Sequence, residues 1–338
     1  SDLVETGRTI MHAGLHRLAY LATIVTFAVI VLGAFVRLSD AGLGCPDWPG
    51  CYGQLTWPQV PEEIQQANQA FPERPVEAAK AWKEMVHRYL AGALVLLVVA
   101  INALAWKNGA AGRLRALAGA LLLLILFQAA LGMWTVTLKL LPLVVMAHLL
   151  GGLATFSLLL WLTWNSRPDR LPGNASLTRL RPMILAGLAV LVVQLALGGW
   201  TSANYADLAC PDFPTCQGQW WPESDFADGF VLWREIGVDY EGGILDLRSR
   251  IAIHLAHRIG ALVTFLFLGT LSLRLLRRPE TRREGGILGL LLRAQVVLGI
   301  QNDELQLPLI NAVAHNGFGA LLLASMLWLA YRSAAVQR

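Results

Sequence analysis

Charged residues are scarce in this chain. They make up 15% of the 338 residues, whereas hydrophobic residues make up 55%, and the mean hydropathy is +0.51. So little charge excludes an ordinary soluble globular protein and predicts an integral membrane protein. The basic residues behind the pI of about 9.0 are scattered among short loops, which argues against a nucleic-acid partner.

Cysteine is also scarce, with four residues in all. No Cys-x-x-Cys-His sequence occurs, which excludes the covalent attachment of a c-type haem. A cleavable signal peptide is not evident either, because no small-residue cleavage site follows the first apolar run. We therefore expect that run to be an uncleaved membrane anchor.

Eight apolar stretches predict an all-α protein with eight membrane spans. We expect them at about residues 15–37, 85–106, 113–135, 142–164, 181–203, 251–275, 286–301 and 309–332. The seventh is short and contains Arg293. If the N-terminus is inside, most basic residues fall in inner segments and most acids in outer loops. We expect a multi-pass protein of the bacterial inner (plasma) membrane with both termini in the cytoplasm.

An internal repeat organises the chain. The stretch Cys45-Pro-Asp-Trp-Pro-Gly-Cys51 recurs as Cys210-Pro-Asp-Phe-Pro-Thr-Cys216. The repeat extends into the spans, where these residues correspond: Gly33 with Gly198, and Gln128 with Gln295. Each half then holds four spans. We expect two tandem four-helix bundles, at residues 1–175 and 176–338, related by a pseudo-two-fold axis along the membrane normal.

Four histidines lie near the outer ends of the expected spans, in two matching pairs: His87 with His148, and His257 with His315. An ionisable side chain within a span is costly unless it has a partner. One histidine from each of two facing helices can ligate a haem iron. A helix-end histidine bonded to a neighbouring span is the alternative, but the duplicated spacing favours ligands. We predict two non-covalent haem sites near the outer face.

Three charged residues lie beside these histidines. Arg88 and Arg258 follow the first histidine of each pair, and their guanidinium groups suit haem propionates. Glu84 lies on the same helix face as His87, where a carboxylate could move protons or stabilise a cation. An acid at a helix N-terminus, favoured by the dipole, is the alternative. Since the second half has His254 at this position, only the first half keeps an acid, and we predict a catalytic role for Glu84.

The cysteines lie in two long outer loops, residues 38–84 and 204–250, on the oxidising side of the membrane. We predict the disulfides Cys45–Cys51 and Cys210–Cys216. Each could pin its loop, the role that we favour for Cys210–Cys216, or take part in redox exchange if it is exposed. Loops of this length favour local structure, and we expect short amphipathic segments over the bundles.

Together these motifs resemble the haem A synthase family of bacteria and mitochondria. The resemblance covers essentially the whole chain and includes Gly33-Ala-Phe-Val-Arg37-Leu, Ala41-Gly42-Leu43 and Glu84-x-x-His87-Arg88. It implies an oxidoreductase that oxidises the C8 methyl of haem O to the formyl of haem A by successive hydroxylations, for the assembly of terminal oxidases.

The resemblance also implies a division of labour. His87 and His148 would bind the substrate haem O, His257 and His315 would ligate a resident haem b, and Glu84 would match the functionally important acid of the family. Implied partners are haem O, membrane lipid, haem O synthase and an electron donor, and a homo-oligomer stays open. Some family members lack the loop cysteines, which argues against a catalytic role for Cys45 and Cys51. The second outer loop is long for the family and could cap the resident haem or dock a partner.

Two other classes of protein share part of this pattern. A dihaem b electron-transfer protein would use the same four ligands, but it gives no reason for an acid in one half only. A transporter could also use a duplicated bundle. It would need a polar path at mid-membrane, whereas the ionisable residues gather at the outer end. We therefore prefer the haem A synthase interpretation.

Overall fold

The computed structural model describes residues 2–107, 110–167, 169 and 173–334, with side chains from residue 13 onward. Apart from loops, these ranges are helical, and their β-type pairings are two isolated bridges, Cys51–Gln54 and Cys216–Gln219. The predicted all-α class is therefore confirmed.

Eight of the described helices are long and apolar enough to cross a membrane, as predicted. They are α1 (Asp2–Leu38), α3 (Ala78–Lys107), α4 (Gly112–Thr137), α5 (Pro142–Asn165), α6 (Ala175–Ala203), α8 (Leu247–Leu276), α9 (Arg282–Glu304) and α10 (Leu309–Ala334). The expectation that the seventh span is short is wrong, because a 3-10 turn at Pro279–Thr281 runs directly into α9. Together they give 26 residues, Pro279–Glu304.

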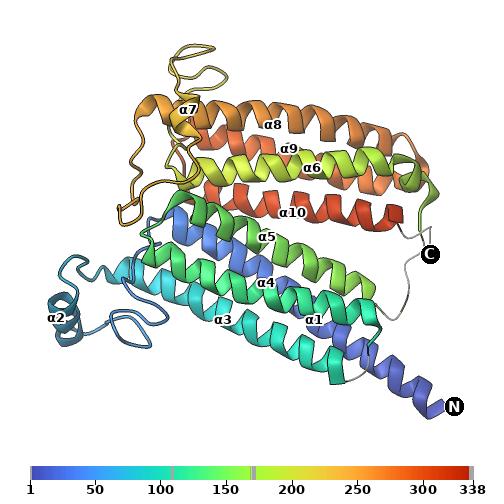
Figure 1. Ribbon diagram of the computed structural model, residues 1–338. Coiled ribbons are helices and arrows are strands. Elements are labelled where there is room, and N and C mark those ends of the chain that lie inside the picture. Colours follow the sequence, from blue (N-terminus) through green and yellow to red (C-terminus); the bar gives the residue numbers. More distant parts are fainter. Residues whose placement is uncertain (1, 108–109, 168, 170–172, 335–338) are drawn as a thin grey trace. The chain divides into compact units, whose positions relative to one another are not determined.

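The first compact unit comprises residues 1–170 and 235–242. In it α1 packs against α3 and α5, and α4 packs against the same two helices, so the four spans form a bundle (Figure 1). Its interior is filled by fully buried aliphatic side chains such as Val98, Ile101, Leu121 and Leu159. Residues 235–242, from the second outer loop, thus belong to the first unit. The expected boundary between residues 175 and 176 assigned them to the second bundle.

The second unit comprises residues 171–234 and 243–338. Here α6 packs against α8 and α10, and α9 packs against the same two helices. The order of neighbours around this bundle repeats that of the first, as the duplication predicts. The pseudo-two-fold axis between the bundles stays a prediction.

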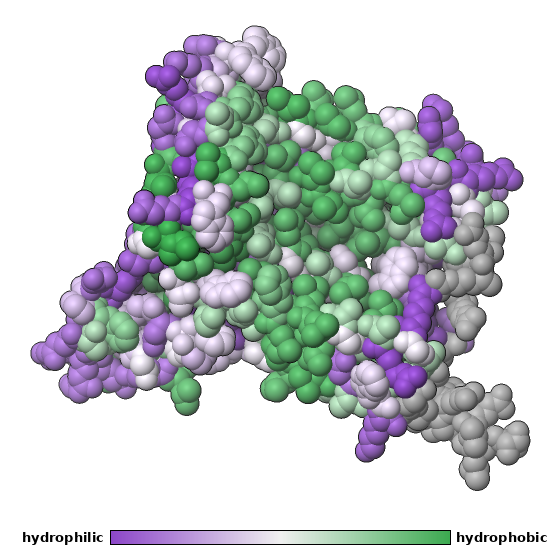
Figure 2. Space-filling view, viewed as in Figure 1, coloured by the Kyte–Doolittle hydropathy of each residue, from purple (hydrophilic) through white to green (hydrophobic). Residues whose placement is uncertain are grey.

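Each outer loop contains a short helix, α2 (Pro61–Ala70) in the first and α7 (Phe226–Gly229) in the second. Pro61 begins α2 and two acids follow in its first turn, an arrangement that suits a helix N-terminus. On the face shown in Figure 2, hydrophobic residues cover the middle of the helices and hydrophilic residues gather at their ends. Large apolar side chains such as Leu96 and Leu123 are 71% and 72% exposed, as expected for helices that contact lipid.

Candidate functional site

The first histidine pair lies inside the first bundle, His87 on α3 and His148 on α5. Because α3 begins at Ala78, before the expected residue 85, His87 lies about 13 Å along the helix from its start. Since α3 and α5 both pack against α1 and α4, the two histidines lie on helices of one bundle. His257 on α8 and His315 on α10 are placed in the same way in the second bundle.

Each of the four imidazole rings packs against a glycine of a neighbouring spanning helix. A Cβ atom built on Gly33 would lie 3.0 Å from Cε1 of His87, and one on Gly132 would lie 3.4 Å from Cε1 of His148. The second bundle repeats this arrangement with Gly198 against His257 and Gly299 against His315, both at 3.1 Å. At Gly33, Gly198 and Gly299 a side chain would crowd the ring that lies beside the backbone. The repeat pointed to Gly33 and Gly198, whereas Gly132 and Gly299 were missed.

The ring nitrogens are incompletely satisfied, which fits axial ligands. Among the described residues, buried Nδ1 of His87, His148 and His315 has no hydrogen bond of full geometry. A buried imidazole nitrogen without a partner is costly, and ligation of an iron would use one of the two ring nitrogens.

Glutamine side chains contact both rings of the second pair. Nε2 of Gln194 lies 3.0 Å from Nδ1 of His257, and Nε2 of Gln295 lies 3.3 Å from Nε2 of His315. Across the described residues, no three side chains of His, Cys, Asp or Glu converge as a metal-ion site. A haem iron needs only two axial protein ligands, a number that each histidine pair could supply.

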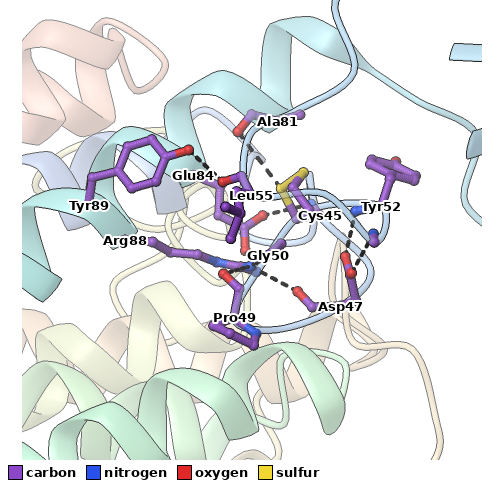
Figure 3. The surroundings of a disulfide bond; sticks show 12 residues. Cys45, Asp47, Pro49, Gly50, Tyr52, Leu55, Ala81, Glu84, Arg88 and Tyr89 are labelled. Carbon is purple, nitrogen blue, oxygen red and sulfur yellow. Dashed lines mark hydrogen bonds and ion pairs between the residues drawn. A yellow bond between two sulfur atoms is a disulfide. The ribbon is translucent and has the colours of Figure 1, made fainter. Parts of the chain in front are cut away.

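Glu84 connects α3 to the first disulfide loop (Figure 3). Its carboxylate is 4% exposed; Oε2 accepts a hydrogen bond of 2.9 Å from the backbone amide of Cys45, and Oε1 pairs with Arg88 at 2.5 Å. Because α3 begins at Ala78, no acid lies in its first turn. Glu84 is therefore not the helix N-terminal acid considered as the alternative, but a buried, paired carboxylate one turn from His87.

Arg88 and Arg258 hold the two disulfide loops. The guanidinium of Arg88 donates to the carbonyls of Asp47 at 2.8 Å and Gly50 at 2.5 Å. That of Arg258 donates to the carbonyls of Cys210, Asp212 and Thr215 at 2.7 to 2.9 Å. These contacts occupy much of each guanidinium fork. The pairing of either arginine with a haem propionate stays a prediction.

Asp303 on α9 is a buried acid that the sequence interpretation missed. Its Oδ2 lies 2.7 Å from Arg258, and its Oδ1 lies 3.4 Å from Nε2 of His254. His254 also contacts the carbonyl of Ala206 through Nδ1 at 2.9 Å. The position equivalent to Glu84 is His254, as the sequence shows, but the second half also supplies a carboxylate beside Arg258, from α9. The repeat gives no signal for this acid, because the register of Gln128 and Gln295 aligns Asp303 with Val136.

Both predicted disulfides form, Cys45–Cys51 and Cys210–Cys216. All four cysteines are at most 1% exposed. The two loops contain turns with matching hydrogen bonds. Asp47 accepts from the backbone amides of Tyr52 and Gly53. Asp212 accepts from those of Gln217 and Gly218. Thiol–disulfide exchange requires access to a sulfur, so the burial favours a structural role for both bonds.

Comparison with known proteins gives one consistent result. A family model described as cytochrome oxidase assembly protein matches residues 16–327. The haem A synthase of Shewanella oneidensis is 48% identical over 309 residues, which cover 91% of this chain and 93% of that protein. The haem A synthase of Caulobacter sp. is 28% identical over 338 residues, covering 93% and 94%, and that of Rhizorhabdus wittichii is 27% identical over 335 residues, covering 91% and 90%.

Proposed function

Because the chain belongs to the cytochrome oxidase assembly protein family, we propose that it is a haem A synthase, an enzyme of haem A biosynthesis, as its relative in Shewanella oneidensis is named. Its substrate is then haem O and its product haem A. One observation carries the assignment of the sites: two bundles each present a pair of histidines, and every imidazole is packed against a glycine.

The first bundle is proposed as the substrate site. His87 and His148 hold the iron of haem O, and Glu84 lies one turn from His87 on the same helix. The carboxylate of Glu84 has Arg88 and the backbone amide of Cys45 as partners, and each of its oxygens has a second lone pair that can accept a proton. In the second bundle, Asp303 contacts both Arg258 and His254. That acid lies on α9, which carries neither histidine of the second pair.

The second bundle is proposed to hold a resident haem b between His257 and His315. When bound, this haem supplies one-electron chemistry. The chain itself contributes orientation: Gln194 and Gln295 contact the rings of the two ligands, while Gly198 and Gly299 let those rings lie against the helix backbone. These four residues would hold the two imidazole rings in one orientation, and the orientation of its ligands affects how a metal is coordinated.

The proposed reaction is oxidation of the C8 methyl of haem O. A first hydroxylation gives an alcohol, and a second gives a geminal diol that loses water to leave the formyl group. His87 and His148 orient the porphyrin, the disulfide loop clamped by Arg88 covers the outer end, and Glu84 moves a proton at its carboxylate. Haem O enters sideways from the lipid with its farnesyl tail near the acyl chains.

The membrane setting follows from charge. Basic residues favour inner segments, so we propose an inner (plasma) membrane protein with cytoplasmic termini and haem sites toward the outer face. Haem O synthase and an electron donor are the proposed partners. Each hydroxylation oxidises the C8 methyl carbon by two electrons and adds one oxygen atom, so the reaction needs an oxidant and an oxygen source besides haem O.

Extraction and identification of porphyrins tests this function. We expect haem A and haem b from the wild type when haem O is supplied, loss of haem O and haem A in His87→Ala, and loss of haem b in His257→Ala. Loss of the same haem in both variants would overturn the division between the bundles. A wild type that carries only haem b would instead support the dihaem electron-transfer protein.

The role of Glu84 has its own test. Glu84→Gln can still accept from the amide of Cys45 but cannot carry the charge, so we expect conversion of haem O to fall by about 10²-fold or more. Glu73→Gln, at an exposed position of the loop before α3, is the control and should convert haem O at the wild-type rate. Full activity of Glu84→Gln would remove Glu84 from the mechanism.

A further inference from the structure

Residues 235–242, here called the outer strap, come from the second outer loop but pack within the first unit. Contacts at two places in that unit hold this segment. One place is polar and lies at the start of α3, and the other is apolar and lies at the turn between α4 and α5. The strap therefore crosses the outer end of the first bundle.

The polar anchor is a group of ion pairs. Arg74 pairs with Asp239 and Glu241 through its two terminal nitrogens, each at 2.5 Å, and Lys80 lies 3.7 Å from Glu241. The side chains of Arg74 and Glu241 are only 25% and 23% exposed. Ion pairs in a network and partly removed from water are stronger than isolated surface pairs, so these contacts resist release of the strap.

The apolar anchor is Tyr240, whose side chain is 2% exposed. It belongs to a buried cluster with Leu43, Leu131, Val136, Leu140, Leu141 and Val144. The backbone amide of Tyr240 donates to the carbonyl of Lys139 at 3.0 Å, and its hydroxyl donates to the carbonyl of Glu235 at 2.7 Å. A tyrosine buried with its hydroxyl satisfied is a strong anchor.

Both anchors lie next to the proposed substrate site. Leu131 precedes Gly132, which packs against His148, and Val144 lies one turn before His148 on α5. On the other side, Lys80 lies one turn before Glu84 on α3. The strap thus spans the outer side of one histidine ligand and of the buried acid.

The second bundle shows the contrast. By the register of Gln128 and Gln295, Leu138 at the α4–α5 turn corresponds to Leu305 at the turn between α9 and α10. Leu138 packs against the Tyr240 cluster, whereas Leu305 is 58% exposed. The strap therefore covers this turn in the bundle that is proposed to release a product. The corresponding residue is exposed in the bundle that is proposed to keep its haem.

We propose that the outer strap retains the porphyrin in the first bundle between the two hydroxylations, so that the alcohol is not released before its second oxidation. This inference rests on the proposed function, since retention matters only in an oxidation of two steps, where a bound first product reaches the aldehyde without having to bind again. Tyr240 and Arg74 act as positioning residues, because they hold the strap and contact no reacting atom. Loosening either anchor speeds release of the alcohol.

The test compares the alcohol and aldehyde porphyrins extracted from membranes that produce haem O. We expect Tyr240→Ala and Arg74→Gln to raise the ratio of alcohol to haem A by about tenfold, and Tyr240→Phe and Arg74→Lys to restore most of the wild-type ratio. Arg248→Gln is the control, because it breaks the Arg248–Glu223 pair of the same loop, whose side chains are 60% and 75% exposed. This control should leave the ratio unchanged.

Hydrogen exchange of the strap amides in the full-length protein provides a readout that does not depend on activity. We expect faster exchange over residues 235–242 in both anchor variants. If exchange accelerates while the alcohol ratio stays at the wild-type value, the retention role is wrong. If Tyr240→Ala does not fold, Arg74→Gln decides the question. A wild type that makes neither alcohol nor haem A refutes the proposed function itself, which separates the two failures.

Discussion

Asp303 and Arg258 form an ion pair of 2.7 Å across two helices of the second bundle. The first bundle builds the same pair within one helix, from Glu84 and Arg88 at 2.5 Å. In both, the arginine also holds the carbonyls of a disulfide loop. The carboxylate thus neutralises a partly buried guanidinium in each half, and only in the first half does it share a helix with a histidine ligand.

Asp303→Asn should destabilise the second bundle. The change removes the negative partner of Arg258, whose side chain is 14% exposed, and breaking a buried pair costs about 3–5 kcal/mol. Thermal unfolding in detergent and the haem b content of the purified protein measure the effect. Glu304→Gln, at the exposed neighbouring position, is the control. Equal stability of both variants would mean that the pair contributes little.

Alanine in place of a ring-packed glycine should disturb the histidine beside it. A methyl group on Gly33 would meet the ring of His87 at 3.0 Å, and one on Gly198 would meet His257 at 3.1 Å. Overpacking of this kind costs about 1–3 kcal/mol, which exceeds the gain of up to about 1 kcal/mol in helix propensity. We expect Gly33→Ala to lose haem O binding and Gly198→Ala to lose haem b, each measured by porphyrin content and absorption spectra.

Two glycines of the same helical bundle serve as controls for that series. Among the described residues, a Cβ atom added at Gly92 on α3 or at Gly119 on α4 would meet no neighbouring atom within 4 Å, so alanine there should gain helix propensity without a clash. Haem content should then match the wild type. Haem loss in Gly92→Ala equal to that in Gly33→Ala would show that helix packing in general, and not ring contact, is responsible.

The disulfides should resist reduction in the folded protein. Their cysteines are at most 1% exposed, so a reductant and an alkylating reagent should label them only after denaturation. Mass spectrometry of labelled protein measures this. Rapid labelling of Cys45 and Cys51 under native conditions, with Cys210 and Cys216 protected, would revive redox exchange at the first loop.

Serine replacement of either disulfide should lower stability to a similar extent. Both bonds close loops with a sequence separation of 6, which corresponds to about 2 kcal/mol in the loop-entropy account. Activity should respond unequally, because the amide of Cys45 donates to Glu84. We expect the Cys45→Ser, Cys51→Ser variant to lose more activity than the Cys210→Ser, Cys216→Ser variant at matched stability.

Tyr52 should titrate late. Burial raises its pKa to about 12, partly offset by Arg74 and reinforced by Glu77, Glu84 and Asp47. Because the pKa in the folded state lies above the ordinary value of 10.0, the stabilisation is fully present below pH 10 and is lost as pH rises toward 12. The phenolate absorbance difference between wild type and Tyr52→Phe checks this. A difference that develops with a midpoint near 10 would contradict it.

The spans were predictable from sequence because lipid requires long apolar runs. Helix starts were less so: Ala78 to Glu84 form the first two turns of α3, and hydropathy does not distinguish a polar helical turn from a loop. The same limit hid the start of the seventh span at Pro279. Only backbone hydrogen bonding, which continues beyond the apolar stretch, sets these boundaries.

The histidine pairs were predictable because the repeat places them at matching positions, whereas Asp303 and the outer strap were not. Asp303 contacts Arg258 across two helices, and Arg74 contacts Glu241 across 167 residues of sequence. Contacts of this kind depend on the packing of distant segments, which periodicity and spacing do not report.

The outer strap makes the first bundle dependent on a segment from the second half of the chain. Doubling of a gene for four helices yields two self-contained products, each able to be cut away from the other. Here the first bundle takes Tyr240 and Glu241 from chain that follows the sixth helix, α6. A break in the linker before α6 would leave the earlier fragment without its cover, so the two copies are no longer interchangeable parts and must be inherited as one.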